Sequence, residues 1–68
     1  MTVNEFLSYS ADKEMQEFEI WDCVKEETAY KGTIFDCPID YLVAVVESID
    51  LINVYSPHLV FNVELYWL

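Results

Sequence analysis

Carboxylates are the most numerous side chains of this sequence that could take part in binding or catalysis. Thirteen Asp and Glu residues stand against three Lys and no Arg in 68 residues, and the formal net charge is −10. This charge excludes autonomous binding of DNA or RNA, because affinity for phosphates requires Lys and Arg to displace counterions. It also argues against docking on an anionic membrane. The partner that the charge favours is therefore a basic protein surface.

The carboxylates form two groups along the chain. The first group is Glu14, Glu17, Glu19, Glu26 and Glu27, and the second is Asp36, Asp40, Glu47 and Asp50. Residues on one face of a strand repeat at about 6.6–6.8 Å, a spacing that offers a row of charges to a groove built for phosphates. We predict that the first group binds the partner, with Glu17 and Glu19 flanking Trp21 as an anchor. The alternative is a solvated face that keeps a small apolar domain soluble.

Residues suited to metal binding or nucleophilic catalysis are few. No loop has the close, regular carboxylate spacing with a glycine that is typical of calcium sites. The soft ligands are Cys23, Cys37 and His58, and none is paired at the spacing of a structural zinc site. No pattern joins a thiol to an imidazole and an orienting group. The sequence therefore predicts no metal, no cofactor and no catalytic residue; a thiol of lowered pKa would argue for an enzyme.

Aromatic residues outside the expected core indicate an interaction surface. Trp21 has the parity of the polar face of its strand, and Tyr66, Trp67 and Leu68 form an apolar stretch. Exposed aromatic anchors among steering charges are typical of protein interfaces. We therefore include Trp21 in the partner-binding set and assign possible self-association to Tyr66, Trp67 and Leu68, through a last strand exposed at the sheet edge.

Composition predicts one folded domain, 1–68, in the cytoplasm. Apolar residues make up 54% and aromatic residues 16% of the chain, far from the profile of disorder. The first residues lack the pattern of a signal peptide, and the apolar run 41–46 is too short to cross a bilayer. In the cytoplasm the two cysteines are expected to be free thiols.

The first half of the chain predicts a helix followed by a hairpin. Thr2 and Glu5 have the spacing of a capping box, and apolar residues then share a helical face as far as Ala11. Alternation predicts a strand over 17–25, with Phe18, Ile20, Asp22 and Val24 on the core face. A turn at Glu26-Glu27 and a second strand over 28–35, with Gly32 at a bulge or a close backbone contact, complete the hairpin.

The second half predicts a helical turn and another hairpin. Residues 36–41 contain Pro38 in a capped first turn, and 43–55 form a third strand with a bulge near Asp50. His58 is expected in the turn before a final strand over 59–65. The fold class is α+β: a short N-terminal helix on a four-stranded, mostly antiparallel sheet, with the helical turn between the hairpins. The alternative is a shorter sheet with a helix through 40–47.

A resemblance places the chain in a genomic setting. The helix Thr2 to Leu7, the strand motif Phe18 to Asp22, the motif Tyr30-Lys31-Gly32, and the segments 48–50 and 62–64 resemble small acidic proteins encoded by bacterial phages and mobile elements. The resemblance implies a fold and a setting, and no functional residue is transferred from it. Acidic phage proteins often look like DNA mimics that inhibit restriction enzymes or CRISPR nucleases, as anti-CRISPR proteins do.

Two hypotheses follow from the sequence. The first is a non-enzymatic inhibitor that mimics nucleic acid and occupies the basic channel of a nucleic-acid-binding protein. The second is a small homo-oligomeric interaction module of unknown role whose acidity serves solubility. The first predicts that binding to the partner weakens steeply as the salt concentration rises, because surface charges are screened. The second predicts self-association through the Tyr66-Trp67-Leu68 end.

Overall fold

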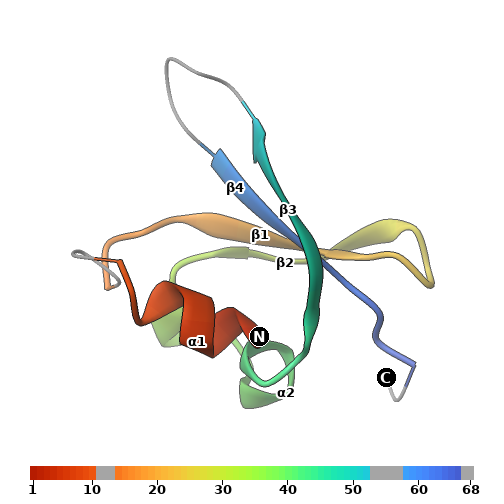
Figure 1. Cartoon of the computed structure of the whole chain (residues 1–68), viewed down its shortest axis with the longest axis horizontal. Coiled ribbons are helices and arrows are strands. Elements are labelled where there is room, and N and C mark those ends of the chain that lie inside the picture. Colours follow the sequence, from red (N-terminus) through yellow and green to blue (C-terminus); the bar gives the residue numbers. More distant parts are fainter. Residues whose placement is uncertain (11–13, 53–57, 67–68) are drawn as a thin grey trace.

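The molecule is an α+β fold built on one mixed four-stranded sheet, as predicted. The computed structural model describes residues 1–10, 14–52 and 58–66. In chain order the elements are α1 (Val3–Leu7), β1 (Phe18–Asp22), β2 (Glu27–Gly32), the 3₁₀ turn η1 (Ile34–Asp36), α2 (Ile39–Leu42), β3 (Val46–Ile52) and β4 (His58–Val63) (Figure 1). Both helices are short, so the sheet supplies most of the regular structure.

The capping box predicted for α1 is confirmed. The Thr2 hydroxyl accepts a hydrogen bond from the Glu5 N–H at 3.1 Å, and Glu5 Oε1 accepts from the Thr2 N–H at 3.4 Å. The helix nevertheless ends at Leu7. The Ser8 hydroxyl donates to the Glu5 carbonyl at 2.6 Å, and the Tyr9 N–H donates to the Phe6 carbonyl instead. A serine that takes a helical acceptor in this way competes with the backbone ladder. Ala11 lies outside the described residues.

The strand order is β2-β1-β4-β3, which places the last strand in the middle of the sheet. β1 pairs with β2, and β3 with β4, in antiparallel hairpins, whereas β1 and β4 pair in parallel from Phe18↔Leu59 to Asp22↔Val63. The prediction that the last strand is an exposed edge was therefore wrong. A central strand is covered on both flanks, and β4 buries Val60 on one face as well as Phe61 on the other.

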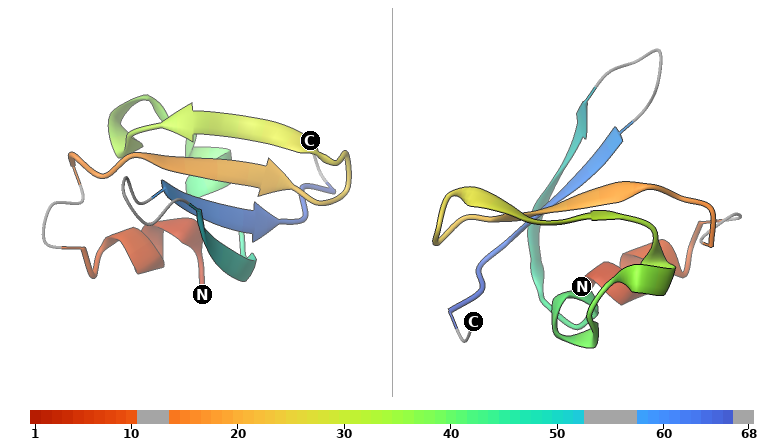
Figure 2. Two further views of the ribbon diagram at one scale, coloured as in Figure 1. Left: turned by 90° about the horizontal axis from the view of Figure 1, so that it is seen from above. Right: turned by 180° about the vertical axis from the view of Figure 1, so that it is seen from behind.

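Both helices cover one face of the sheet, and the core lies between them (Figure 2). Phe18 and Ile20 of β1 and Phe61 and Val63 of β4 are completely buried there, together with helical residues that include Leu7. The Phe18 and Phe61 rings meet edge to face with centroids 5.7 Å apart. The parallel pair of strands therefore carries the centre of the core.

The core face of β1 also buries a carboxylate, at Asp22, as its parity predicted. Val24, predicted on the same face, is exposed, because β1 ends at Asp22 and Val24 lies in the turn that follows. Asp22 Oδ1 accepts from the Val24 N–H at 2.9 Å and from the Leu65 N–H at 3.4 Å. The first contact shapes the turn that follows β1, and the second holds the chain that leaves β4. Asp22 therefore ties the two hairpins together at one end of the sheet.

Several element boundaries differ from the predictions. β2 stops at Gly32, which has a φ of +152°. The Tyr30 hydroxyl lies 2.8 Å from the position that a Cβ would take there, so the close neighbour is a side chain and not the backbone that was predicted. The bulge of the third strand lies between Val46 and Ser48 rather than near Asp50. The long helix over 40–47 does not form, because α2 ends at Leu42. His58 belongs to β4 and not to a turn.

Glu26 gives a direct test of the turn between β1 and β2, because it has a φ of +55°. We expect Glu26→Gly to raise the free energy of unfolding by about 0.5–1 kcal/mol, since glycine adopts this conformation without a Cβ clash. Glu26→Gln removes the same charge and keeps the Cβ, so it serves as the control. Chemical denaturation of the three proteins measures the effect, and equal stability of the two variants would contradict it.

Candidate partner-binding surface

One face of the sheet carries no helix among the described residues, and we call it the open face (Figure 1). It consists of Glu19 and Trp21 from β1, Thr28 and Lys31 from β2, Ser48 and Asp50 from β3, and His58, Val60 and Asn62 from β4. Trp21 is half-buried there, on the polar parity that was predicted. The face is therefore mostly polar, with an aromatic side chain near its centre.

Glu19 on the open face is held by its neighbours. Its Oε1 lies 3.2 Å from His58 Nε2, and the Thr28 hydroxyl donates to its Oε2 at 2.9 Å. Partial burial raises the pKa of Glu19, but hydrogen bonds from His58 and Thr28 and the charges of His58 and Lys31 outweigh this effect and lower the pKa overall. Glu19 therefore links β1 to β2 and β4, in addition to contributing negative charge to the open face. The sequence placed His58 in a turn and so missed this contact.

A second polar group on the open face joins β3 to β4. Asn62 Nδ2 donates to Asp50 Oδ2 at 2.8 Å and to Ser48 Oγ at 3.0 Å. These contacts follow from the antiparallel register, which sets Asn62 beside Ser48. Alternation alone put Asn62 on this face, but the sequence gave no signal for its partners. The group fixes the direction of Asp50 rather than leaving it to solvent.

The predicted acidic residues do not gather in one cluster. Glu14 and Glu17 precede β1, whereas Glu26 and Glu27 lie at the turn after it, and all four are exposed. A five-residue strand separates the two pairs, which corresponds to about 17 Å. Glu19 lies between them on the open face. The structure therefore arranges the predicted set as a line along β1, with charged ends.

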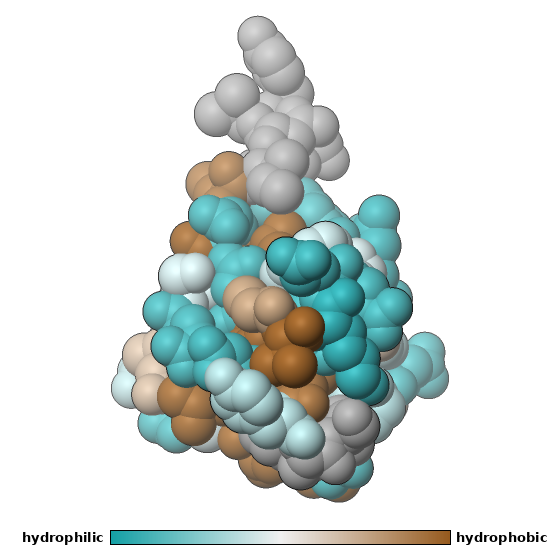
Figure 3. Space-filling model, turned by 90° about the vertical axis from the view of Figure 1, so that its right-hand side faces the viewer, coloured by the Kyte–Doolittle hydropathy of each residue, from teal (hydrophilic) through white to brown (hydrophobic). Residues whose placement is uncertain are grey.

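At the turn end of β1 the fold adds carboxylates that the sequence analysis did not assign to the site. The register aligns Glu27 with Asp22, Asp22 with Val63, and Val63 with Val46, so the residues next to them share one end of the sheet. We call Glu26, Glu27, Glu47 and Glu64 the hairpin-end acidic group. Hydrophilic residues surround a small apolar area at this end of the molecule (Figure 3).

Two members of the hairpin-end acidic group, Glu47 and Glu64, act on the thiol of Cys23. The Cys23 backbone N–H donates to the Val63 carbonyl at 2.8 Å, which seats the turn against the end of β4. Desolvation raises the pKa of Cys23, and the negative charges of Glu64, Asp22 and Glu47 raise it further. Carboxylates from three strands' ends therefore act on one point.

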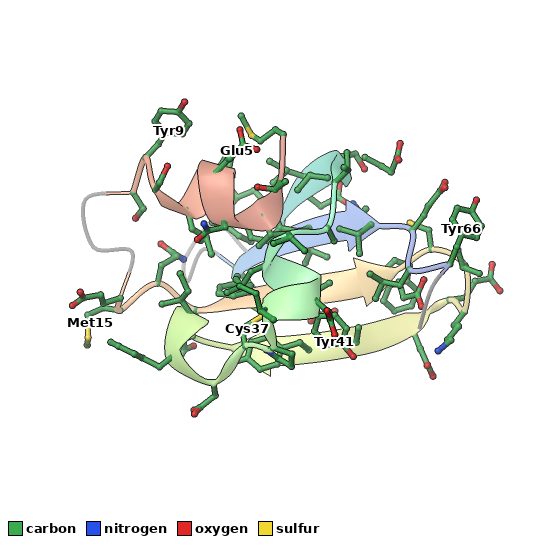
Figure 4. All side chains as sticks on the ribbon, turned by 90° about the horizontal axis from the view of Figure 1, so that it is seen from below. Glu5, Tyr9, Met15, Cys37, Tyr41 and Tyr66 are labelled. Atoms are coloured by element: carbon green, nitrogen blue, oxygen red, sulfur yellow. The ribbon has the colours of Figure 1, made fainter. Side chains whose placement is uncertain are left out.

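Tyr66 is the aromatic side chain at this end (Figure 4). It is 73% exposed. A hydrogen bond with Glu64 and the nearby negative charges of Glu64 and Glu47 raise the pKa of Tyr66. Trp67 and Leu68, predicted with it for self-association, lie outside the described residues. The structure thus places one exposed aromatic ring beside the hairpin-end acidic group.

The second thiol is Cys37, which is buried in the core, where desolvation raises its pKa to about 11. A nucleophilic cysteine needs a lowered pKa, and both thiols shift in the opposite direction. Across residues 1–10, 14–52 and 58–66, no group of three or more His, Cys, Asp or Glu side chains could hold a metal ion. In the same ranges, no helix has the length and apolar character needed to span a membrane.

Comparison with known proteins adds no relative to these observations. No protein-family model, no curated protein and no solved structure matches this chain.

The contact between Glu19 and His58 predicts a pH dependence of stability. Because the folded pKa of Glu19 is lowered, its contribution is present above the unfolded value of 4.5 and is lost as the pH falls through the folded pKa. We expect Glu19→Gln to cost about 1 kcal/mol at pH 7 and less at pH 3. Glu17→Gln removes an exposed carboxylate and serves as the control. The difference in the free energy of unfolding between this variant and the parent protein should not shrink in the same way at pH 3. Denaturant melts at both pH values measure this difference.

The raised thiol pKa values predict slow alkylation. At pH 8 we expect Cys23 to react with iodoacetamide more slowly than free cysteine, because less of it is thiolate. Glu64→Gln should speed this reaction by removing the charge that raises the thiol pKa most, and raised salt should speed it by screening the remaining charges. Cys37 should react only when the chain unfolds. A reaction at Cys23 faster than that of free cysteine would contradict the assignment of its surroundings.

Proposed function

We propose that this chain is a non-enzymatic acidic protein that binds a basic, nucleic-acid-binding protein surface and excludes nucleic acid from it. The observation that carries the proposal is the exposure of the carboxylates. Of the twelve Asp and Glu residues in the described part of the chain, nine are exposed, Glu19 and Glu64 are half-buried, and Asp22 is buried. A charge held at the surface in this way acts on a partner at long range.

The acidic ends of β1 support mimicry of a nucleic-acid backbone. Exposed carboxylates before the strand and the hairpin-end acidic group after it present negative charge at both ends of one rigid element. Such charges can replace phosphates in a channel lined by Lys and Arg. Trp21 on the open face and Tyr66 at the hairpin end supply aromatic contact area. A phage or mobile-element inhibitor of a restriction or CRISPR nuclease is the form of this function that we propose.

A second candidate function rests on the exposure of Tyr66. In this version the chain is a homo-oligomeric interaction module that associates through Tyr66 and the residues after it, and its acidity serves solubility. Association of this kind places an aromatic anchor in a partner pocket. It differs from mimicry in its salt response, because apolar contacts are not screened. Sedimentation of the parent protein and of Trp67→Ala at low and raised salt separates the two functions.

Paired charge reversals test the proposed function. Glu26→Lys/Glu27→Lys changes the net charge by four units at the hairpin end, and Asp36→Lys/Asp40→Lys makes the same change in the helical connection. We expect tagged parent protein to retain nucleic-acid-binding proteins from a bacterial lysate. The first variant should retain at least about tenfold less, and the second should resemble the parent. Bound proteins are identified by mass spectrometry.

Two further washes make this experiment decisive. Raising the salt from about 0.1 M to about 1 M shortens the Debye length from roughly 10 Å to 3 Å, so the captured proteins should elute. Duplex DNA should displace them at low salt. Equal losses by both variants would show that only net charge matters. Capture that resists both salt and DNA would overturn mimicry, and recovery of only the untagged copy of the chain would favour the oligomeric module.

A further inference from the structure

The outer edge of β3 is an unprotected strand edge. β3 pairs with β4 on one side, and the sheet order places it at the end of the sheet. Its first residue is covered, because the Val46 N–H donates to the Met1 carbonyl at 2.8 Å and Thr2 bridges Val45. From Ser48 to Leu51, no described residue pairs with the outer side. The backbone groups there form a template for another strand.

The two edges of the sheet differ in how they are protected. β2, the other edge, contains Lys31 and pairs with β1 through an irregular register. Lysine and bulges are the features with which natural sheets prevent edge pairing. The run from Ser48 to Leu51 contains neither lysine nor proline, and its register with β4 is regular. Among the described residues, the run from Ser48 to Leu51 therefore presents a regular template, and its charged residue, Asp50, disfavours an acidic strand as the partner.

The β3 edge also has two chemically distinct faces. On the helix side, Ile49 and Leu51 are exposed although they have the parity of the core, and Leu51 is 62% exposed. On the open face, Ser48 and Asp50 are polar, and Asp50 is oriented by Asn62. A strand added here would meet aliphatic side chains on one face and a carboxylate on the other.

We infer that the β3 edge binds an extended, cationic segment of the partner protein as an added fifth strand, with apolar and basic residues in alternation. Charge selects this occupant. A second copy of the chain would bring −10 against −10, whereas a basic segment lowers the charge. Glu47 at the start of the edge belongs to the hairpin-end acidic group, so the edge continues into the acidic surface. This inference rests on the proposed function in that it assumes a basic partner.

The added strand divides affinity between two sources. Main-chain hydrogen bonds to the edge supply sequence-independent binding, and alternate side chains supply specificity. Apolar side chains of the segment would cover Ile49 and Leu51, and Lys or Arg would lie beside Asp50. The charge at the hairpin end would steer the approach of the segment. The site therefore recognises an extended segment that is both basic and amphipathic.

A synthetic peptide tests this inference on the full chain. The probe is an acetylated, fluorescent peptide of about seven residues that alternates Val and Lys, and its match is the same peptide methylated at alternate backbone nitrogens. We expect fluorescence anisotropy to give at least about tenfold weaker binding for the methylated peptide. Amide hydrogen exchange should slow at residues 48–51 when the first peptide binds.

Two variants localise the site. Leu51→Lys should weaken peptide binding by about tenfold, because it places a charge on the apolar side of the edge and repels the peptide. Ile39→Lys adds the same charge at an exposed apolar residue of α2, outside both the β3 edge and the hairpin-end acidic group, so it controls for net charge and should bind like the parent. Near-identical far-ultraviolet spectra and melts of the two variants would show that the fold is intact.

Three results would overturn the inference. Equal affinity for the two peptides would show that charge alone binds them. Exchange protection confined to residues outside 48–51 would place the peptide elsewhere. If amides 48–51 are protected from exchange without peptide, and if this protection increases with protein concentration while a dimer mass appears, the edge binds a second copy of the chain. Salt-resistant capture in the lysate experiment, combined with peptide binding at the β3 edge, would remove nucleic-acid mimicry while leaving strand addition intact.

Discussion

The parallel pairing of β1 with β4 is the contact on which the rest of the structure depends, because it joins the two hairpins into one sheet. Its register sets Phe18 and Ile20 beside Leu59 and Phe61. A shift of one residue would turn the buried apolar side chains of β1 outward and bring Glu19 and Trp21 inward. The burial of Phe18, Ile20 and Phe61 therefore fixes the register, and the register decides which acidic residues meet at each end of the sheet.

The carboxylates divide into those that hold the fold and those that remain for a partner. Glu5 caps α1, Asp22 binds two backbone N–H groups, and Glu19 joins β1 to His58. Each of these accepts hydrogen bonds from neighbouring groups of the fold. Glu47 and Glu64 of the hairpin-end acidic group instead act together as negative charges on Cys23, and the core must offset the repulsion between them. Charge without a structural role, kept at one end of a small sheet, is the physical basis of the proposed function.

The hairpin-end acidic group adjoins the β3 edge at Glu47, so one partner can contact both. Charge acts over about a Debye length and guides approach, whereas an edge strand acts only at hydrogen-bonding distance. The face that bears the helices and the face that bears Asp50 make the two sides of this edge unlike each other. A partner segment is therefore selected by charge before it is selected by its backbone.

Sequence alone determined the local features of this protein. The capping box at Thr2, the inward parity of Asp22, the outward parity of Trp21 and the two hairpins all follow from spacing within a few residues, where neighbours in the chain are neighbours in space. Tertiary structure alone decided that β4 is central and that β3 is an edge. It also brought Glu47 and Glu64 to the turn that holds Glu26 and paired Glu19 with His58. These contacts depend on the parallel strand order, which is set by burial summed over the whole core and leaves no mark in the periodicity of any one strand.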